Sequence, residues 1–394
     1  MTLTKTALRK VHRYLALVLA VLWLSQALTG LVMVFRWELD DASIAGDAMP
    51  LDPAALEQRI TALEAEQPGQ EVYQLYTSGS AAGRFDLYVR NPDGETDLVR
   101  VAGDGTVLRA QPYGRDFAEA GLIQAAAFLH QTLFAGDTGK WIIGVSGLLL
   151  LTSLVLGAVL AWPRARQWRA TLWPRAMRPG AGRLYAWHRA VGLWLLLPAA
   201  VLVTAGVLMT FEEAVESALG LDVTPPELEA APPVTGRPVG LAPALDTALQ
   251  RFPGSELSGV AMPSPERPWY RVRVRQPGEW RRAYGTTVVY VSAASGDVIL
   301  EQDALAAPPA RRFVASLYPI HTGEAAGLPG RLVSLGVGLW LLTMLGLGLT
   351  LWSSRRRRSR ATTGAGPAVQ ATAGLNATIS DPKSNAGQAK AGSI

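Results

Sequence analysis

The sequence contains no cysteine and only four histidines in 394 residues. The absence of cysteine excludes disulfide bonds, cysteine-ligated iron–sulfur clusters, thiolate zinc sites and thiol catalysis. Charged residues are also scarce, at 18%, whereas apolar residues make up 49% of the chain. This balance is typical of a chain in which long apolar runs alternate with ordinary polar sequence, and it argues against a wholly soluble protein.

Four uncharged segments are long enough to cross a hydrocarbon core of about 30 Å. They cover residues 14–35, 141–162, 190–211 and 332–352. The first run is longer than the apolar core of a signal peptide, and no cleavage motif follows it closely, so it is interpreted as a retained helix. The sequence therefore predicts a membrane protein with four transmembrane helices.

Charge is distributed unevenly between the segments that separate these runs. Residues 1–14, 163–189 and 353–394 carry 18 basic residues and one acidic residue, a net charge of +17. Residues 36–140 and 212–331 carry 19 basic and 31 acidic residues, a net charge of −12. The positive-inside rule then predicts cytoplasmic termini, a cytoplasmic middle segment and two periplasmic segments in a bacterial inner membrane. The basic residues thus set orientation, and no nucleic-acid partner is predicted.

The two halves of the chain resemble each other. A shift of 176 residues places the first apolar run on the third, and a shift of 191 residues places the second on the fourth. The equivalent positions include His12 and His188, Arg13 and Arg189, Gly30 and Gly206, His130 and His321, Gly157 and Gly348, and Lys140 and Arg331. Because equivalent runs cross the membrane in the same direction, the sequence predicts a parallel internal duplication.

The two long outer segments share a looser pattern. Apolar residues have helical spacing over 53–66 in the first segment and over 241–252 in the second. Alternating, strand-like runs follow a Pro-Gly pair in each, and a turn and a last strand close the segment. The strand-like runs cover residues 84–90, 97–101, 269–275 and 286–291. A helix followed by a small antiparallel sheet is an α+β module.

These features predict a membrane α-helical fold: a four-helix transmembrane bundle from a parallel duplication, with two extracytoplasmic α+β modules. The predicted boundaries are 1–36, 139–163, 187–211 and 330–353 for the transmembrane helices, 37–138 and 212–329 for the modules, and 164–186 for a cytoplasmic loop. Residues 354–394 are mostly small and polar and lack aromatic side chains, so they are predicted to be a disordered cytoplasmic tail.

All four histidines belong to the duplicated positions. His12 and His188 precede the first and third runs on the predicted cytoplasmic side, while His130 and His321 lie on the outer side. Each outer histidine begins the pattern His-x5-Gly-x2-Gly-[Lys/Arg]. Two imidazoles on facing helices suit the axial positions of a haem iron. The sequence therefore predicts two haem sites, one formed by His12 and His188 and the other by His130 and His321.

The sequence also allows other roles for these histidines. A histidine at the end of a membrane helix is often an interfacial residue, and paired histidines also suit a proton relay or a transition-metal transport site. No Asp or Glu lies within the four runs, although proton-coupled transport usually needs one. Met33 and Met209 would suit copper, but a methionine at helical spacing is more often a packing residue.

Arginines accompany the predicted sites. Arg13 and Arg189 directly follow the inner histidines, where a guanidinium would either bind a haem propionate or simply mark the positive side of the membrane. Arg271, Arg273 and Arg275 alternate along one predicted strand, as in a solvated strand face or a surface that binds an anion. The sequence has no nucleotide- or flavin-binding motif, so a separate cytoplasmic donor or a membrane quinol would supply electrons.

The histidine motifs, the apolar runs and the outer modules together resemble the PepSY-associated transmembrane family of iron-regulated inner-membrane proteins. The resemblance covers the chain to about residue 354, and its motifs include residues 12–13, 188–189, 129–140 and 320–331. It implies two b-type haems whose axial ligands are His12, His188, His130 and His321. It also implies that electrons cross the membrane to a periplasmic ferric siderophore. A non-enzymatic PepSY binding or regulatory protein and a metal or siderophore transporter are the alternatives.

Overall fold

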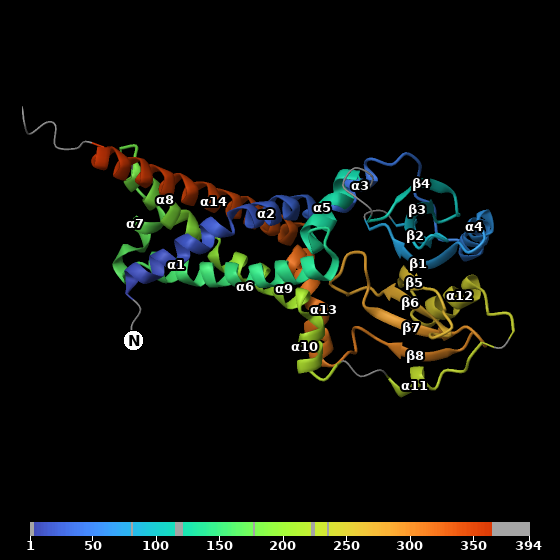
Figure 1. Cartoon of the computed structure of the whole chain (residues 1–394). Coiled ribbons are helices and arrows are strands. Elements are labelled where there is room, and N and C mark those ends of the chain that lie inside the picture. The colour runs from blue at the N-terminus through green and yellow to red at the C-terminus, as the bar shows by residue number, and fades with distance from the viewer. Residues whose placement is uncertain are drawn as a thin grey trace, which may run out of the picture.

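The computed structural model describes residues 4–79, 82–114, 121–175, 178–221, 225–234 and 236–364. Its helices form one elongated layer, and a β-sheet with two covering helices lies at one end of that layer (Figure 1). The start of α1 and the last turns of α14 both lie at the opposite end, far from the sheet.

Two helices are long and apolar enough to cross a membrane by themselves. They are α6 (Gly136–Ala161) and the apolar part of α14 (Gly327–Gly364). The other two predicted runs form bent helix pairs, α1 (Lys5–Val18) with α2 (Ala20–Val34) and α8 (Ala181–Trp194) with α9 (Leu196–Thr210), with bends of 64° and 61°. The described residues thus contain two candidate spans, or four if each bent pair is one span.

The two bends differ in their local cause. The second falls at Leu195, and Pro198 stands three residues later in the first turn of α9. Proline has no N–H to donate and its ring clashes with the carbonyl four residues earlier, here that of Trp194, which favours a bend at this point. No proline lies within the first bent pair, which breaks at Leu19. The sequence around Leu19 does not explain that bend.

Each bent pair divides its contacts between long and short helices. The first halves, α1 and α8, pack against α6 and α14, respectively. The second halves, α2 and α9, pack against α14 and α6, respectively, and also against the short helices α5 (Gly121–Thr132) and α13 (Pro309–Thr322). The short helices lie beside the sheet (Figure 1). The helix layer therefore has two levels along its length. The first, formed by α1 and α8, lies far from the sheet, and the second, where α2 and α9 meet α5 and α13, lies beside it.

The strands form one continuous antiparallel sheet of eight strands in the order β4-β3-β2-β1-β5-β6-β7-β8. The strands are β1 (Glu71–Thr77), β2 (Arg84–Arg90), β3 (Thr96–Ala102), β4 (Val107–Pro112), β5 (Glu256–Ala261), β6 (Trp269–Arg275), β7 (Thr287–Ser292) and β8 (Val298–Gln302). The two predicted modules meet where β1 pairs with β5. Neither of these two strands stands out in the sequence, and their pairing turns two small sheets into one.

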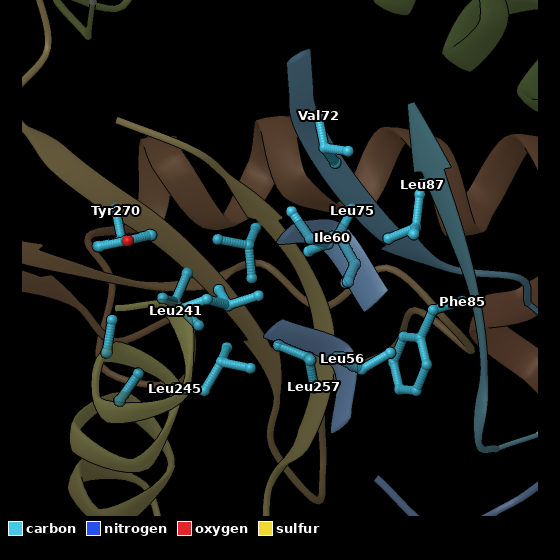
Figure 2. Close-up of a cluster of buried hydrophobic side chains, with 14 of the residues drawn as sticks. Leu56, Ile60, Val72, Leu75, Phe85, Leu87, Leu241, Leu245, Leu257 and Tyr270 are labelled. Carbon is cyan, nitrogen blue, oxygen red and sulfur yellow. The ribbon is translucent and has the colours of Figure 1, made fainter. Parts of the chain in front are cut away.

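The main core lies between the sheet and two helices, α4 (Pro53–Glu66) and α12 (Leu241–Arg251). Figure 2 shows Leu56 of α4 beside Phe85 of β2 and Leu245 of α12 near the strands, and Leu56, Leu245, Leu75 and Leu87 are fully buried. Each buried leucine stabilises the fold by about 1.5–3 kcal/mol relative to an exposed one. This core is built from both halves of the chain, so the two halves of the sheet cannot separate without exposing it.

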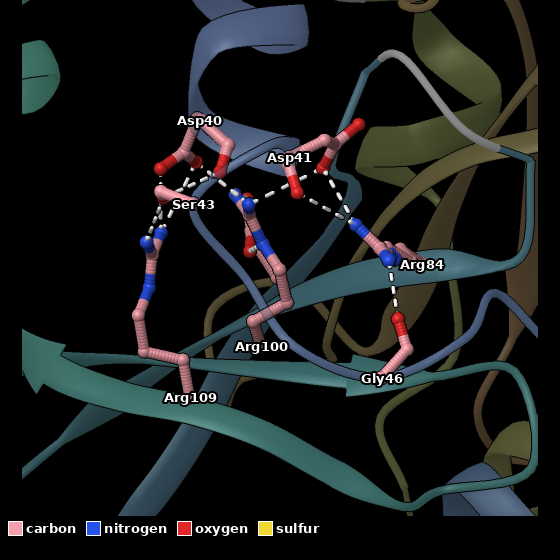
Figure 3. A network of polar contacts seen from close by, with 8 residues as sticks. Asp40, Asp41, Ser43, Gly46, Arg84, Arg100 and Arg109 are labelled. Carbon is pink, nitrogen blue, oxygen red and sulfur yellow. Dashed lines mark hydrogen bonds and ion pairs between the residues drawn. The ribbon is translucent and has the colours of Figure 1, made fainter.

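A buried polar network attaches the end of the first bent pair to the sheet (Figure 3). Asp40 and Asp41 end the short helix α3 (Arg36–Asp41), which follows α2 directly. Arg100 of β3 donates to both oxygens of Asp86 at 2.6 and 2.9 Å and lies 2.6 Å from Asp40. Since these charges are shielded from water, their pairing holds α3 against β2, β3 and β4.

The remaining segments differ from the predicted boundaries in detail. α14 continues to Gly364, past the predicted end of the last span at residue 353. The rest of the predicted tail, 365–394, lies outside the described residues. The predicted cytoplasmic loop at 164–186 holds a 3₁₀ turn (Ala165–Gln167), α7 (Trp168–Leu172) and the start of α8, and two further short helices, α10 (Glu212–Ala218) and α11 (Pro226–Glu229), precede α12.

We expect Arg100→Ala to destabilise the protein by about 3–5 kcal/mol, because it leaves Asp86 as an uncompensated buried charge, whereas Asp40 keeps its pair with Arg109. The matched control is Arg90→Ala, which removes a half-exposed pair with Glu71 and should cost about 0–1 kcal/mol. Urea denaturation of the full-length protein in detergent, followed by intrinsic fluorescence, measures both. Equal shifts of the unfolding midpoint in the two variants would contradict the structural role given to Arg100.

Candidate functional site

The four histidines lie in two pairs at the two levels of the helix layer. His12 of α1 and His188 of α8 form the distal pair, far from the sheet, with ring centroids 6.4 Å apart. His130 of α5 and His321 of α13 form the proximal pair, beside the sheet, with ring centroids 6.3 Å apart. The structure therefore brings together the same partners that the sequence repeat suggests, and each pair joins the two halves of the chain.

Three of the four imidazoles are oriented by a contact at Nδ1. His12 Nδ1 lies 3.1 Å from the carbonyl of Ser153, and His321 Nδ1 lies 2.9 Å from the carbonyl of Leu202. His130 Nδ1 lies 3.0 Å from the hydroxyl of Thr29. A carbonyl can only accept, so His12 and His321 donate from Nδ1, and their Nε2 atoms keep a free lone pair. No hydrogen bond to any histidine Nε2 is found within the described part of the chain.

A glycine on the neighbouring helix faces each imidazole. A Cβ atom on Gly157 or Gly348 would lie 3.4 or 3.5 Å from Cε1 of His12 or His188, which is ordinary contact distance. A Cβ on Gly30 would lie 3.2 Å from Cε1 of His130. The closest approach is at Gly206, where a Cβ atom would lie 2.6 Å from Cε1 of His321. The proximal imidazoles thus occupy space that a side chain would otherwise fill.

The proximal imidazoles are neutral at pH 7. Burial, together with the positive charge of Arg36, lowers the pKa of His130 to about 4. Burial likewise lowers the pKa of His321. Neutral imidazole is the form that binds a metal ion, because protonation removes the lone pair. Two neutral rings that face each other, each held at Nδ1, are arranged as ligands.

The spacing of the rings suits one metal ion between each pair. Two imidazoles bound through Nε2 at about 2.0–2.1 Å place their ring centres about 6.3 Å apart when the two bonds are collinear. The observed separations are 6.4 and 6.3 Å. Among the described residues, no group of three or more His, Cys, Asp or Glu side chains gathers around a common point.

The two arginines predicted beside the distal pair have different surroundings. Arg189 donates from Nε to the carbonyl of Ala161 at 2.8 Å and so caps the last turn of α6. The guanidinium of Arg13 lies 5.1 Å from the centroid of the Tyr14 ring, and this side chain is exposed. Neither arginine forms an ion pair within the described residues.

The sequence motif gave Arg331 no role of its own, yet this side chain is buried beside the proximal pair. Its Nη2 donates to the carbonyl of Val34 and to Glu38, each at 2.8 Å, and it covers the ring of Phe35. Arg282 also donates to Glu38. Desolvation would raise the pKa of Glu38, but these hydrogen bonds outweigh it and lower the pKa. Arg331 thereby ties α14 to the junction of α2 and α3.

The sequence model of the PepSY-associated TM region matches residues 9–355, which include all four histidines. The chain belongs to this family. The family assignment expected from the histidine motifs is thus confirmed, and no curated protein matches the chain. With its candidate apolar spans and its antiparallel sheet, this PepSY-associated TM protein is a membrane protein.

The absence of native cysteine makes the pairing in this PepSY-associated TM protein directly testable. We expect His12→Cys with His188→Cys, and separately His130→Cys with His321→Cys, to be cross-linked within one chain by a short bis-maleimide. The exchanged combination, His12→Cys with His321→Cys, should not react in this way, because these positions lie at different levels. Mass spectrometry of the digested protein identifies the linked peptides, and cross-linking of the exchanged combination alone would refute the pairing.

Proposed function

We propose that this protein binds two b-type haems and carries electrons across the inner membrane to an acceptor on the sheet side. His12 and His188 would be the axial ligands of one haem, and His130 and His321 those of the other. The observation that carries this proposal is the facing of two imidazole pairs at 6.4 and 6.3 Å, which suits a metal ion between each pair.

The surroundings of each pair fit a haem better than a metal ion held by protein alone. Only two protein ligands meet at each position within the described residues, and a porphyrin supplies the other four. The Nδ1 contacts to Ser153, Thr29 and Leu202 fix the ring orientation, as the outer-shell partners of ligating histidines do. Small residues on the facing helices leave room close to the rings.

The chain's own part in this function is to bind, orient and shield. A bound haem supplies one-electron exchange between ferric and ferrous iron. The helices would hold the two pairs at separate levels. α6 alone, with 26 residues at about 1.5 Å each, is about 39 Å long. Two haems would divide an electron-transfer distance that is too long for a single step.

The duplicated architecture is part of the proposal. Bends at Leu19 and Leu195 are 176 residues apart, the same shift that relates His12 to His188. The strand order is symmetric about the β1–β5 pair. Both features support a four-helix bundle made of two parallel repeats, in which each haem would lie between equivalent helices of the two halves.

The direction of transfer follows from the charge asymmetry of the sequence. The basic side holds the distal pair, so a cytoplasmic donor or membrane quinol would reduce the first haem, with Arg13 and Arg189 near its propionates. The proximal haem would then pass the electron to a periplasmic ferric siderophore, the acceptor implied by the resemblance described above. Reduction weakens binding by a chelator that is selective for ferric iron, so no catalytic side chain is required.

An absorption spectrum tests the haem proposal. Full-length protein from haem-supplied cells should show a Soret band and reduced α and β bands, with two haems per chain by pyridine haemochrome assay. His130→Ala and His188→Ala should each reduce the content to about one haem, because each removes one axial ligand. A folded, colourless protein would instead favour a regulatory PepSY protein, and chelate uptake into vesicles without reductant would favour a transporter.

Two glycine variants test the geometry of the proposed sites separately. Gly206→Ala places a methyl group 2.6 Å from His321, so we expect the proximal haem to be lost or its spectrum to change. Gly348→Ala places the methyl group at ordinary contact distance, 3.5 Å from His188, and should leave the distal haem in place. Haem content and low-temperature α-band spectra distinguish the two, and a normal proximal haem in Gly206→Ala would contradict the assignment.

A further inference from the structure

The eight-stranded sheet has two faces, and only one of them belongs to the main core. Every second residue of β6 is buried in the core with α4 and α12. The residues between them lie on the opposite face, because side chains alternate along a strand. They are Arg271, Arg273 and Arg275. The second face of the sheet thus carries three arginines in a row along one strand.

The three arginines differ in their partners. Arg275 donates to Glu256 of β5 at 2.6 Å. The side chains of Arg271 and Arg273 form no hydrogen bond and no ion pair within the described parts of the chain. The Nε atom of Arg273 is moreover buried. A buried donor without a partner is costly, and a ligand that accepts from it would remove this cost.

The first module carries a carboxylate at the equivalent place. Asp86 stands third in β2, as Arg271 stands third in β6. Asp86 lies opposite Arg100 of β3 and accepts two hydrogen bonds from it. Arg271 instead lies opposite Tyr290 of β7. The second module therefore has a cation where the first has an ion pair, and no acidic residue lies across from it.

An aromatic side chain lies beside this pair of arginines. Gly259 of β5 lies opposite Arg273, and Tyr76 of β1 lies opposite Gly259. The ring of Tyr76 covers Gly259 and would collide with a side chain at that position. The ring is thereby placed next to Arg273. Aromatic rings and guanidinium groups both stack on flat, unsaturated groups of a ligand.

The nearby Arg281 is in a different situation. Its charge acts on Arg273, but three carboxylates also act on it, those of Glu212, Glu279 and Glu324. Burial is the main cause of the lowered pKa of Arg273, and the positive charge of Arg271 lowers it further. The positive charge that has no partner on this face is therefore that of Arg271 and Arg273.

We propose that Arg271 and Arg273 bind an anionic ferric chelate of the catecholate type and make this protein selective for acceptors with negative charge. This proposal rests on the proposed function, because it specifies the chemistry of the periplasmic acceptor. A guanidinium donates two parallel hydrogen bonds to a pair of anionic oxygens, and each catecholate group offers such a pair. The ring of Tyr76 would lie against a catecholate ring.

A phospholipid headgroup is the other source of an anion for these arginines. The place of β6 in the fold favours the chelate. β6 is an inner strand of the sheet, between β5 and β7, and the sheet lies at one end of the helix layer (Figure 1). A site on this strand is thus separate from the helices that would contact lipid.

Calorimetric titration of gallium chelates into the full-length protein, in phosphatidylcholine nanodiscs, tests the proposal. Ga(III) replaces Fe(III) in such chelates but is not reduced, so binding is measured apart from electron transfer. A gallium tris-catecholate is an anion, whereas a gallium tris-hydroxamate with a free amine is a cation. We expect the wild-type protein to bind the tris-catecholate at least about tenfold more tightly.

Arg271→Gln and Arg273→Gln should each weaken tris-catecholate binding by about tenfold to a hundredfold, the usual effect of losing a hydrogen bond to a charged group. Arg273→Lys should restore part of the affinity, because it restores the charge but not the paired donors. Arg275→Gln is the matched control, since Arg275 lies on the same strand and face but is already paired with Glu256. It should bind as the wild-type protein does, and circular dichroism checks that each variant is folded.

Equal affinity of the wild-type protein for the two chelates would overturn the proposal, and so would unchanged tris-catecholate binding in both glutamine variants. Loss of that binding when phosphatidylglycerol is added to the nanodiscs would assign the arginines to lipid instead. Gallium binding at the sheet needs no haem. A colourless protein that still binds the tris-catecholate would therefore refute the proposed electron transfer and leave the anion site in place.

Discussion

The close approach of imidazoles from opposite halves of the chain is the constraint on which the rest of the structure depends. Each ring of the two pairs needs a facing partner about 6.3 Å away and a small residue behind it. A pair of straight helices could not present rings at two levels to different neighbours. The bends at Leu19 and Leu195 allow α1 and α8 to carry the distal pair while α2 and α9 pack against the helices that carry the proximal pair.

The sheet is joined to the helices of the proximal pair by ion pairs and by aromatic contacts such as that of Tyr113 with Phe128 of α5. Arg100, Asp40 and Asp86 hold α3 against the strands, and Arg331 and Arg282 hold the start of α3 at Glu38. Since α3 is continuous with α2, which contacts His130 through Thr29 and Gly30, movement of the sheet would reach the proximal pair directly.

Sequence reasoning succeeded where a local pattern carried the information. The repeat identified which histidines are partners, and alternation along residues 84–90 and 269–275 marked β2 and β6 with their observed ends. It did not reveal β1 and β5. Each of these strands pairs with the next strand of its own half, and the pairing of β1 with β5, which joins the two halves, has no signal within either half.

The sequence by itself determined the apolar runs, the family, the four candidate ligands and the symmetry that relates them, because hydrophobic length and spacing are properties of neighbouring residues. Only the tertiary structure decided that the rings of each pair lie together and that the two modules share one sheet. Those features depend on contacts between residues more than a hundred positions apart, such as His130 with His321 and Arg331 with Val34. No local preference encodes such distances; they arise when the helices and strands bury their faces against each other.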